Sequence, residues 1–192
     1  MRYILTALFT EASPIIKSFD LQLKHRKPFK IYENENIKLI ISGIGNIQAA
    51  SALTYLLTKY PPKDIDKIFN IGICASSNKD DQIGTIYQIK KIVDKSTNHV
   101  YHLKSERYLQ NTTIATYATV QTKIDQKYHL ADMESAGFYI SAKKFIASEN
   151  ITVLKIISDH MEDKIPKKEE VETMVEKHLP LFHKILSATD ED

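Results

Sequence analysis

Short runs of apolar residues alternate with polar turns and helical stripes along most of the chain. The runs are nearly continuous, which is typical of strands buried on both faces of a sheet. Apolar residues at helical spacing follow several of the runs, as in proteins whose strands and helices alternate. The pattern predicts strands at 3–9, 37–42, 67–71 and 152–158, and helices from Ser13-Pro14 onward and at 47–60, 134–148 and 167–186, the last kinked at Pro180.

The middle of the chain has a different pattern. Segments 83–93, 100–103 and 112–120 alternate or carry β-branched residues, which favours further strands without helices between them. The sequence contains neither an internal repeat nor a low-complexity linker. We therefore predict an α/β fold, a three-layer sandwich with a central mixed β-sheet flanked by helices, formed by one domain over 1–187 with an acidic tail at 188–192.

Composition narrows the function classes. The chain has 192 residues and a formal net charge of +2, which is too small for a typical nucleic-acid binder. No apolar run approaches the ~18 residues of a membrane span, and no signal peptide is recognised. Cys74 is the single cysteine, so no disulfide can form within the chain, and a reducing, cytoplasmic compartment is expected. A small-molecule partner fits these features best.

Polar residues follow several predicted strands. In α/β sheets, ligands bind beyond the carboxyl ends of the strands, so these residues are expected to converge on one crevice. Three of them are carboxylates. The candidates are Glu11, Gly43 with its glycine turn to Gly45, Asn70, Gly72, Glu134, and the pair Ser158-Asp159.

Four segments in order resemble a known family. They are 41–50 (ISGIGNIQAA), 68–72 (IFNIG), 131–138 (ADMESAGF) and 154–159 (LKIISD). Together they are similar to motifs of the nucleoside phosphorylase and methylthioadenosine/S-adenosylhomocysteine nucleosidase superfamily. The resemblance implies a phosphorylase/hydrolase-like fold that cleaves the N-glycosidic bond of a purine-type nucleoside, with water or with phosphate. It also implies a homodimer or higher homo-oligomer, with neither metal nor cofactor apart from phosphate as a possible co-substrate.

The resemblance also assigns roles to residues. Asp159 matches the acid that protonates the departing base, Ser158 the residue that orients it, and Glu11 the group that activates water. Cleavage leaves positive charge on the sugar and negative charge on the base, which these anionic and acidic groups suit. Matching positions that would contact substrate are Met133, Glu134, Gly43, Asn70, Gly72 and Lys155, with Glu134 holding the ribose hydroxyls.

Simpler explanations exist for the same residues. Glu134 could only complement a helix dipole, Glu11 is an ordinary loop glutamate, and Gly43 could serve only to let the backbone turn. The segment 73–76 (ICAS) is more apolar than the family's turn, and Asn70 stands where hexameric phosphorylases have arginine, which favours hydrolysis. Three hypotheses stay open: a nucleosidase, a phosphorylase, and a non-catalytic nucleoside-binding protein. Candidates for stacking on the base are Tyr101, Tyr108, Tyr117 and Tyr128.

Overall fold

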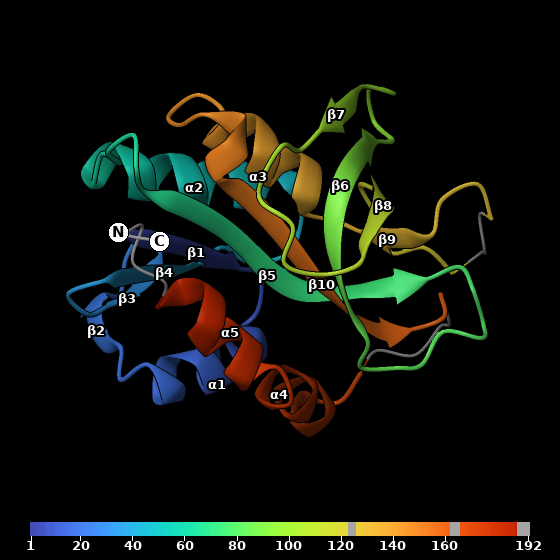
Figure 1. Ribbon diagram of the computed structural model, residues 1–192, viewed down its shortest axis with the longest axis horizontal. Coiled ribbons are helices and arrows are strands. Elements are labelled where there is room, and N and C mark those ends of the chain that lie inside the picture. The colour runs from blue at the N-terminus through green and yellow to red at the C-terminus, as the bar shows by residue number, and fades with distance from the viewer. Residues whose placement is uncertain (123–125, 162–165, 188–192) are drawn as a thin grey trace.

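The computed structural model describes residues 1–122, 126–161 and 166–187. The predicted tail at 188–192 lies outside the described residues. A mixed sheet forms the centre of the molecule (Figure 1). Its strands are β1 (Arg2–Thr6), β2 (Gln22–His25), β3 (Lys30–Glu33), β4 (Ile37–Ile41), β5 (Lys67–Ser76), β6 (Ile86–Asp94), β7 (Val100–His102), β8 (Asn111–Thr116), β9 (Leu130–Asp132) and β10 (Ile151–Asp159).

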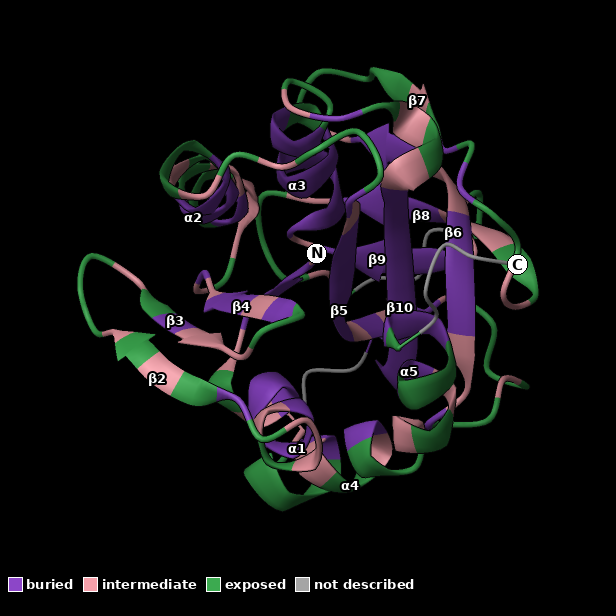
Figure 2. Ribbon diagram, turned by 60° about the vertical axis from the view of Figure 1, so that its left-hand side comes forward, coloured by how far each residue is buried: buried purple, intermediate pink, exposed green. Residues whose placement is uncertain are grey.

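Helices cover both faces of this sheet. The helices are α1 (Phe9–Ser18), α2 (Asn46–Lys59), α3 (Ser135–Ala142), α4 (Lys168–Glu176) and α5 (Leu179–Leu186), with a short 3-10 turn at Ser148–Asn150. α2 and α3 pack on one face, and α1, α4 and α5 pack on the other (Figure 1). Each layer has its own apolar core against the sheet, and the buried residues concentrate on the strands between the helices (Figure 2). The predicted three-layer α/β sandwich is confirmed.

The sheet closes partly on itself. Strand order runs β10-β6-β8-β9-β5-β1-β4-β3-β2, β7 pairs with β6, and β10 also pairs with β5. Strands β5, β9, β8, β6 and β10 therefore form a ring, while β1, β4, β3 and β2 extend from it as an open sheet. β1, β4, β5 and β10 run parallel, so their carboxyl ends meet at one edge.

The predicted end of one strand and the predicted beginning of one helix are wrong. The strand predicted at 67–71 was expected to end before Gly72, but β5 continues to Ser76 because β10 pairs with it up to Ala75. The first helix was expected to begin at Ser13-Pro14, but α1 begins at Phe9. The Glu11 carboxylate accepts hydrogen bonds from the Ala7 and Leu8 N–H groups at the start of this helix.

The other differences concern element ends and exposed strands. The helix predicted at 134–148 ends at Ala142, and the chain then turns so that Ile146 returns to the core. The closing helix divides into α4 and α5. Pro180 lies in the first turn of α5, where its missing N–H removes no helical hydrogen bond. The β2–β3 hairpin was not predicted because its short strands are half-exposed and carry charges. None of the helices in the described ranges is both long and apolar enough to span a bilayer.

Candidate active site

A cavity lies at the edge where the parallel strands end, and it encloses about 250 Å³. Of the predicted site residues, the structure brings together Glu11, Met133, Glu134, Ser158 and Asp159 in its lining. The remaining lining residues are mostly apolar or small. They are Ala7, Leu8, Ile44, Ile73, Cys74, Ala75, Thr119, Val120, Gln121, Ala131, Asp132 and Pro166.

A β-bulge at the end of β10 presents two consecutive residues to this cavity. Ile157 pairs with Cys74 and Asp159 pairs with Ala75, so Ser158 is an extra residue in the strand. In a regular strand neighbouring side chains face opposite sides, whereas a bulge re-aims them. As a result, both Ser158 and Asp159 line the cavity.

Both carboxylate oxygens of Asp159 accept a hydrogen bond. The Ser158 hydroxyl lies 2.7 Å from Asp159 Oδ2, and the Met161 backbone N–H donates to Oδ1 at 2.9 Å. Met161 has a φ of 58°, a left-handed conformation that turns the chain back toward the carboxylate. These contacts hold the Asp159 carboxylate in one orientation.

Glu134 reaches the cavity through close packing of two helices. It lies between β9 and α3, and its Oε1 accepts a hydrogen bond of 2.9 Å from the Gly45 N–H, directly before α2. Asn46 Oδ1 accepts a hydrogen bond of 2.8 Å from the Gly137 N–H. A Cβ on Gly137 would lie 2.2 Å from the Asn46 carbonyl oxygen, so only glycine allows this approach. The packing of α2 on α3 therefore sets the position of the Glu134 carboxylate.

Glu11 is buried and accepts three backbone hydrogen bonds. The Ala7 and Leu8 N–H groups donate to its Oε2 at 2.8 and 2.9 Å, and the Ile73 N–H donates to its Oε1 at 2.9 Å. A Cβ on Gly72 would lie 2.9 Å from Glu11 Oε1. The glycine therefore leaves room for the carboxylate against β5.

A buried ion pair lies beside these groups. The sequence analysis named Lys155 but did not predict its partner Asp132. Lys155 Nζ is 3.0 Å from Asp132 Oδ2. Asp132 also accepts hydrogen bonds from the Thr116 hydroxyl and the Ser135 N–H. A charged residue directly after the buried residues Leu130 and Ala131 was the signal in the sequence that could have indicated Asp132.

The charges of the cavity are one-sided. Glu11, Asp132, Glu134 and Asp159 contribute carboxylates to its lining, and none of its described lining residues is lysine or arginine. Burial raises the pKa of Glu11, although Lys155 and the three backbone N–H groups oppose the shift. Burial, together with the charges of Asp132 and Glu11, raises the pKa of Glu134 to about 7 against the lowering effect of Lys155. Among the described residues, no three His, Cys, Asp or Glu side chains are placed so that together they could hold a metal ion.

The structure places four predicted contact residues outside the cavity lining. Gly43 adjoins the lining residue Ile44 and donates its N–H to Ala7. Asn70 is buried within β5, where its amide donates to the Leu5 carbonyl oxygen at 3.2 Å. Gly72 and Lys155 are opposite each other on β5 and β10 beneath the cavity. Contact of these four residues with a substrate stays a prediction.

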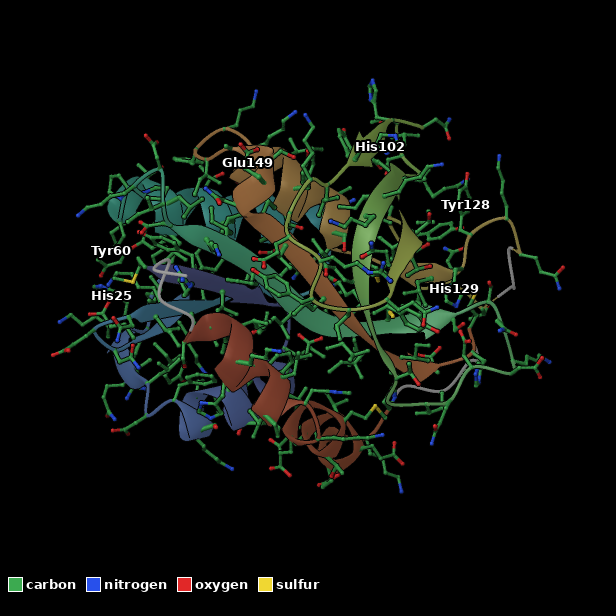
Figure 3. The ribbon with its side chains drawn as sticks, viewed as in Figure 1. His25, Tyr60, His102, Tyr128, His129 and Glu149 are labelled. Carbon is green, nitrogen blue, oxygen red and sulfur yellow. The ribbon has the colours of Figure 1, made fainter. Side chains whose placement is uncertain are left out.

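The base-stacking candidates are also outside the lining. Tyr101 packs against Tyr139 at a ring-centroid distance of 5.4 Å, and Tyr128 lies beside His129 at the β9 side of the molecule (Figure 3). Their segment instead contributes Thr119 to Gln121 to the cavity wall, because the strand predicted at 112–120 ends at Thr116. Ile73 lines the cavity, as expected of an apolar variant of this region, and Cys74 is buried there as a free thiol.

The raised pKa of Glu134 predicts a pH-dependent stability. The folded protein keeps a proton on Glu134 that the unfolded chain releases above its ordinary pKa of 4.5. This group's contribution is therefore fully favourable below about pH 4.5 and is lost as the pH rises to about 7. In urea unfolding, Glu134→Gln should remove up to about 3 kcal/mol of this decline, because the glutamine amide does not ionise. The amide oxygen can still accept the hydrogen bond from the Gly45 N–H. Glu149→Gln, at an exposed position, is the control, and stability curves that stay parallel for Glu134→Gln and wild type would contradict the prediction.

Comparison with known proteins agrees with this geometry. No family model and no curated protein matches the sequence. Among solved structures, 5′-methylthioadenosine nucleosidase of Arabidopsis thaliana superposes with a TM-score of 0.81 at 17% identity, covering 98% of this chain and 96% of its own. The chain has the nucleosidase fold. The resemblance noted in the four sequence segments is thereby confirmed at the level of fold.

Two further structures with the nucleosidase fold carry different names. The 5′-methylthioadenosine/S-adenosylhomocysteine nucleosidase of Helicobacter pylori, solved with butyl-thio-DADMe-Immucillin-A, has a TM-score of 0.79 at 18% identity and 97% coverage of both chains. Futalosine hydrolase of the same organism has a TM-score of 0.74 at 18% identity, covering 97% of this chain and 95% of its own. This range of neighbours fits the nucleosidase fold without selecting a substrate.

Proposed function

We propose that this protein is a nucleosidase that hydrolyses the N-glycosidic bond of a purine-type nucleoside, of the methylthioadenosine or S-adenosylhomocysteine kind. The observation that carries the proposal is the convergence of Glu11, Glu134 and Asp159 on one cavity. These are the three carboxylates that the family resemblance assigned to water activation, ribose binding and protonation of the base.

The proposed reaction uses each carboxyl group in a defined way. The bond between the base nitrogen and the anomeric carbon breaks as the protonated Asp159 carboxyl gives its proton to the base. Water adds its oxygen to the anomeric carbon and gives a proton to Glu11. The three backbone hydrogen bonds of Glu11 occupy three of the four lone pairs of its carboxylate, which leaves one lone pair to accept this proton. Glu134 binds the ribose hydroxyls, and the anionic lining stabilises the positive charge on the sugar.

Water is the favoured nucleophile rather than phosphate. Phosphate binding usually needs a fixed cation, ideally the fork of an arginine. The described cavity lining contains four carboxyl groups and neither lysine nor arginine, so it lacks a cation that would bind phosphate. The buried Lys155 does not compensate, because Asp132 neutralises it.

Base release is the direct test. Methylthioadenosine, S-adenosylhomocysteine, adenosine and inosine would be incubated with the protein, with and without phosphate, and the products separated by chromatography. Release of base without phosphate is the expected result, and reactions without protein are the control. Release only with phosphate would make the chain a phosphorylase. Ligand binding by the folded protein without any release would favour a non-catalytic binding protein and contradict hydrolysis.

The proposal includes a homodimer in the cytoplasm. Two exposed apolar side chains line the cavity, Ile44 at 54% and Val120 at 68% exposure, and Ile47, in the first turn of α2, is 81% exposed. Exposed apolar surface of this kind is typical of a protein interface. Sedimentation velocity should show a dimer, and Ile47→Asp should shift it toward monomer. A monomeric wild-type protein would contradict the prediction. The cytoplasmic placement rests on the single, reduced Cys74.

A further inference from the structure

Lys155 is a buried cation directly beneath the candidate active site. Its side chain is 1% exposed and does not line the cavity. A Cβ built on Gly72 would lie 3.4 Å from Lys155 Nζ and 2.9 Å from Glu11 Oε1, so both groups approach the same position on β5. Burial disfavours the charge of Lys155, but Asp132, Glu134 and Glu11 outweigh burial and raise the pKa of its ammonium group. Lys155 is therefore a positively charged group beside the cavity but outside its lining.

The charge of Lys155 is already matched by Asp132. Their 3.0 Å contact, with the hydrogen bonds from Thr116 and Ser135, fixes Asp132 as the ionised partner. This leaves Glu11 from α1 and Glu134 from the start of α3 facing the same cavity without a cation of their own in its described lining. Two unpaired carboxylates that share a desolvated site do not both ionise near neutral pH.

Hydrogen bonding decides which glutamate keeps the proton. Glu11 accepts three backbone N–H donors, and each of them stabilises its ionised form. Glu134 accepts one backbone N–H, from Gly45, within the described part of the chain. The other titratable groups that face this cluster are Cys74 on β5 and Asp159 on β10. Neither adds positive charge.

We propose that the buried Lys155–Asp132 pair acts as a positioning element that lets only one of the two glutamates ionise, so that the resting site holds Glu11 as the carboxylate and Glu134 as the neutral acid. The catalytic meaning rests on the proposed function. The ionised Glu11 is ready to accept a proton from water, and the neutral Glu134 can donate a hydrogen bond to a ribose hydroxyl as well as accept one. Burial raises the pKa of both glutamates, and it is opposed by three backbone N–H donors at Glu11 but by only one at Glu134 in the described part of the chain.

The first test uses the ligand-free wild-type protein. Carbon-13 NMR of protein labelled at the glutamate side-chain carboxyl carbon should show one carboxyl group that titrates between about pH 6 and 8. That signal should disappear in Glu134→Gln. In Glu11→Gln it should move to lower pH, because the neighbouring negative charge is removed. The proposal is overturned if no glutamate titrates in this range, or if the signal disappears in Glu11→Gln instead.

The second test separates positioning from a purely structural role. Lys155→Met removes the cation and should move the Glu134 titration upward by about one pH unit or more, whereas Asp132→Asn leaves the cation unmatched and should move it downward. Lys155→Arg keeps the charge and should leave the titration close to wild type. Asp132→Asn and Lys155→Arg decide the question if Lys155→Met does not fold. Equal titrations in wild type and Asp132→Asn would overturn the proposal.

These titrations need no substrate, so the two proposals can fail separately. A protein that titrates as expected but releases no base from any nucleoside would contradict the proposed function alone. A protein that releases base while both glutamates titrate at ordinary acidic pH would contradict the positioning role alone. In an active enzyme, the kcat profile against pH should shift in opposite directions in the Lys155→Met and Asp132→Asn variants.

Discussion

Asp159→Asn should lower kcat for nucleoside hydrolysis by about 10²–10⁴-fold with a small change in KM, because general acid catalysis contributes a factor of that size. Asparagine has nearly the same shape as aspartate, and its side-chain oxygen can still accept a hydrogen bond from Ser158 or from the Met161 N–H. It cannot deliver a proton to the departing base. Steady-state kinetics with the best substrate of the nucleoside panel measures the effect.

Two comparisons make this result specific to Asp159. Asp80→Asn changes the same residue type at an exposed position and should leave kcat within twofold of wild type. Ser158→Ala removes the hydroxyl that orients Asp159 and should give an intermediate loss. If Asp159→Asn retained wild-type kcat in a folded protein, the base would have to leave without help from this residue.

The single substitution Glu11→Gln should lower kcat for nucleoside hydrolysis by about 10²–10³-fold, because an amide cannot accept a proton from water. It should also cost about 1–3 kcal/mol of stability. The ionised Glu11 presents two acceptor oxygens to the N–H groups of Ala7, Leu8 and Ile73, whereas glutamine presents one oxygen and one donor nitrogen. One of these N–H groups would then face another donor.

The two effects of Glu11→Gln can be measured apart. Urea unfolding gives the loss of stability, and kcat measured far below the unfolding transition gives the catalytic loss. Glu35→Gln, at an exposed position, should change neither quantity. Loss of stability with unchanged kcat would mean that Glu11 only caps the beginning of α1, which is the simpler explanation raised by the sequence.

The strands could be predicted from the sequence where burial leaves a continuous apolar run. The runs around Ile4, Ile40 and Val153 are of this kind, and each forms a strand of the parallel part of the sheet. Residues at the carboxyl ends of such strands converge by geometry, so Glu11 and Asp159 could be proposed for one site. The edge strand β2 and its neighbour β3 have no such run and were missed.

Other parts of the site depend on contacts between distant residues. The pairing of Lys155 with Asp132 joins β10 to β9, and a sequence shows only that both are charged. The bulge that turns Ser158 and Asp159 toward the same cavity results from an uneven register with β5. The predicted strand stopped before Gly72, because the reason for a glycine within β5, which is to leave room for Glu11, becomes visible only once α1 lies against β5.

The ring formed by β5, β9, β8, β6 and β10 has a consequence for how this protein avoids aggregation. A strand with a partner on both sides offers no free backbone groups to another chain, whereas an unpaired edge is a template for intermolecular sheet growth. Within the described ranges, the sheet ends at β2 and at the three-residue β7. β2 carries the exposed Lys24, a residue type that discourages such growth. The strands that carry the catalytic candidates therefore contribute little to self-association through sheet edges. Substitutions in the site can be made with little risk of creating a new unpaired strand edge.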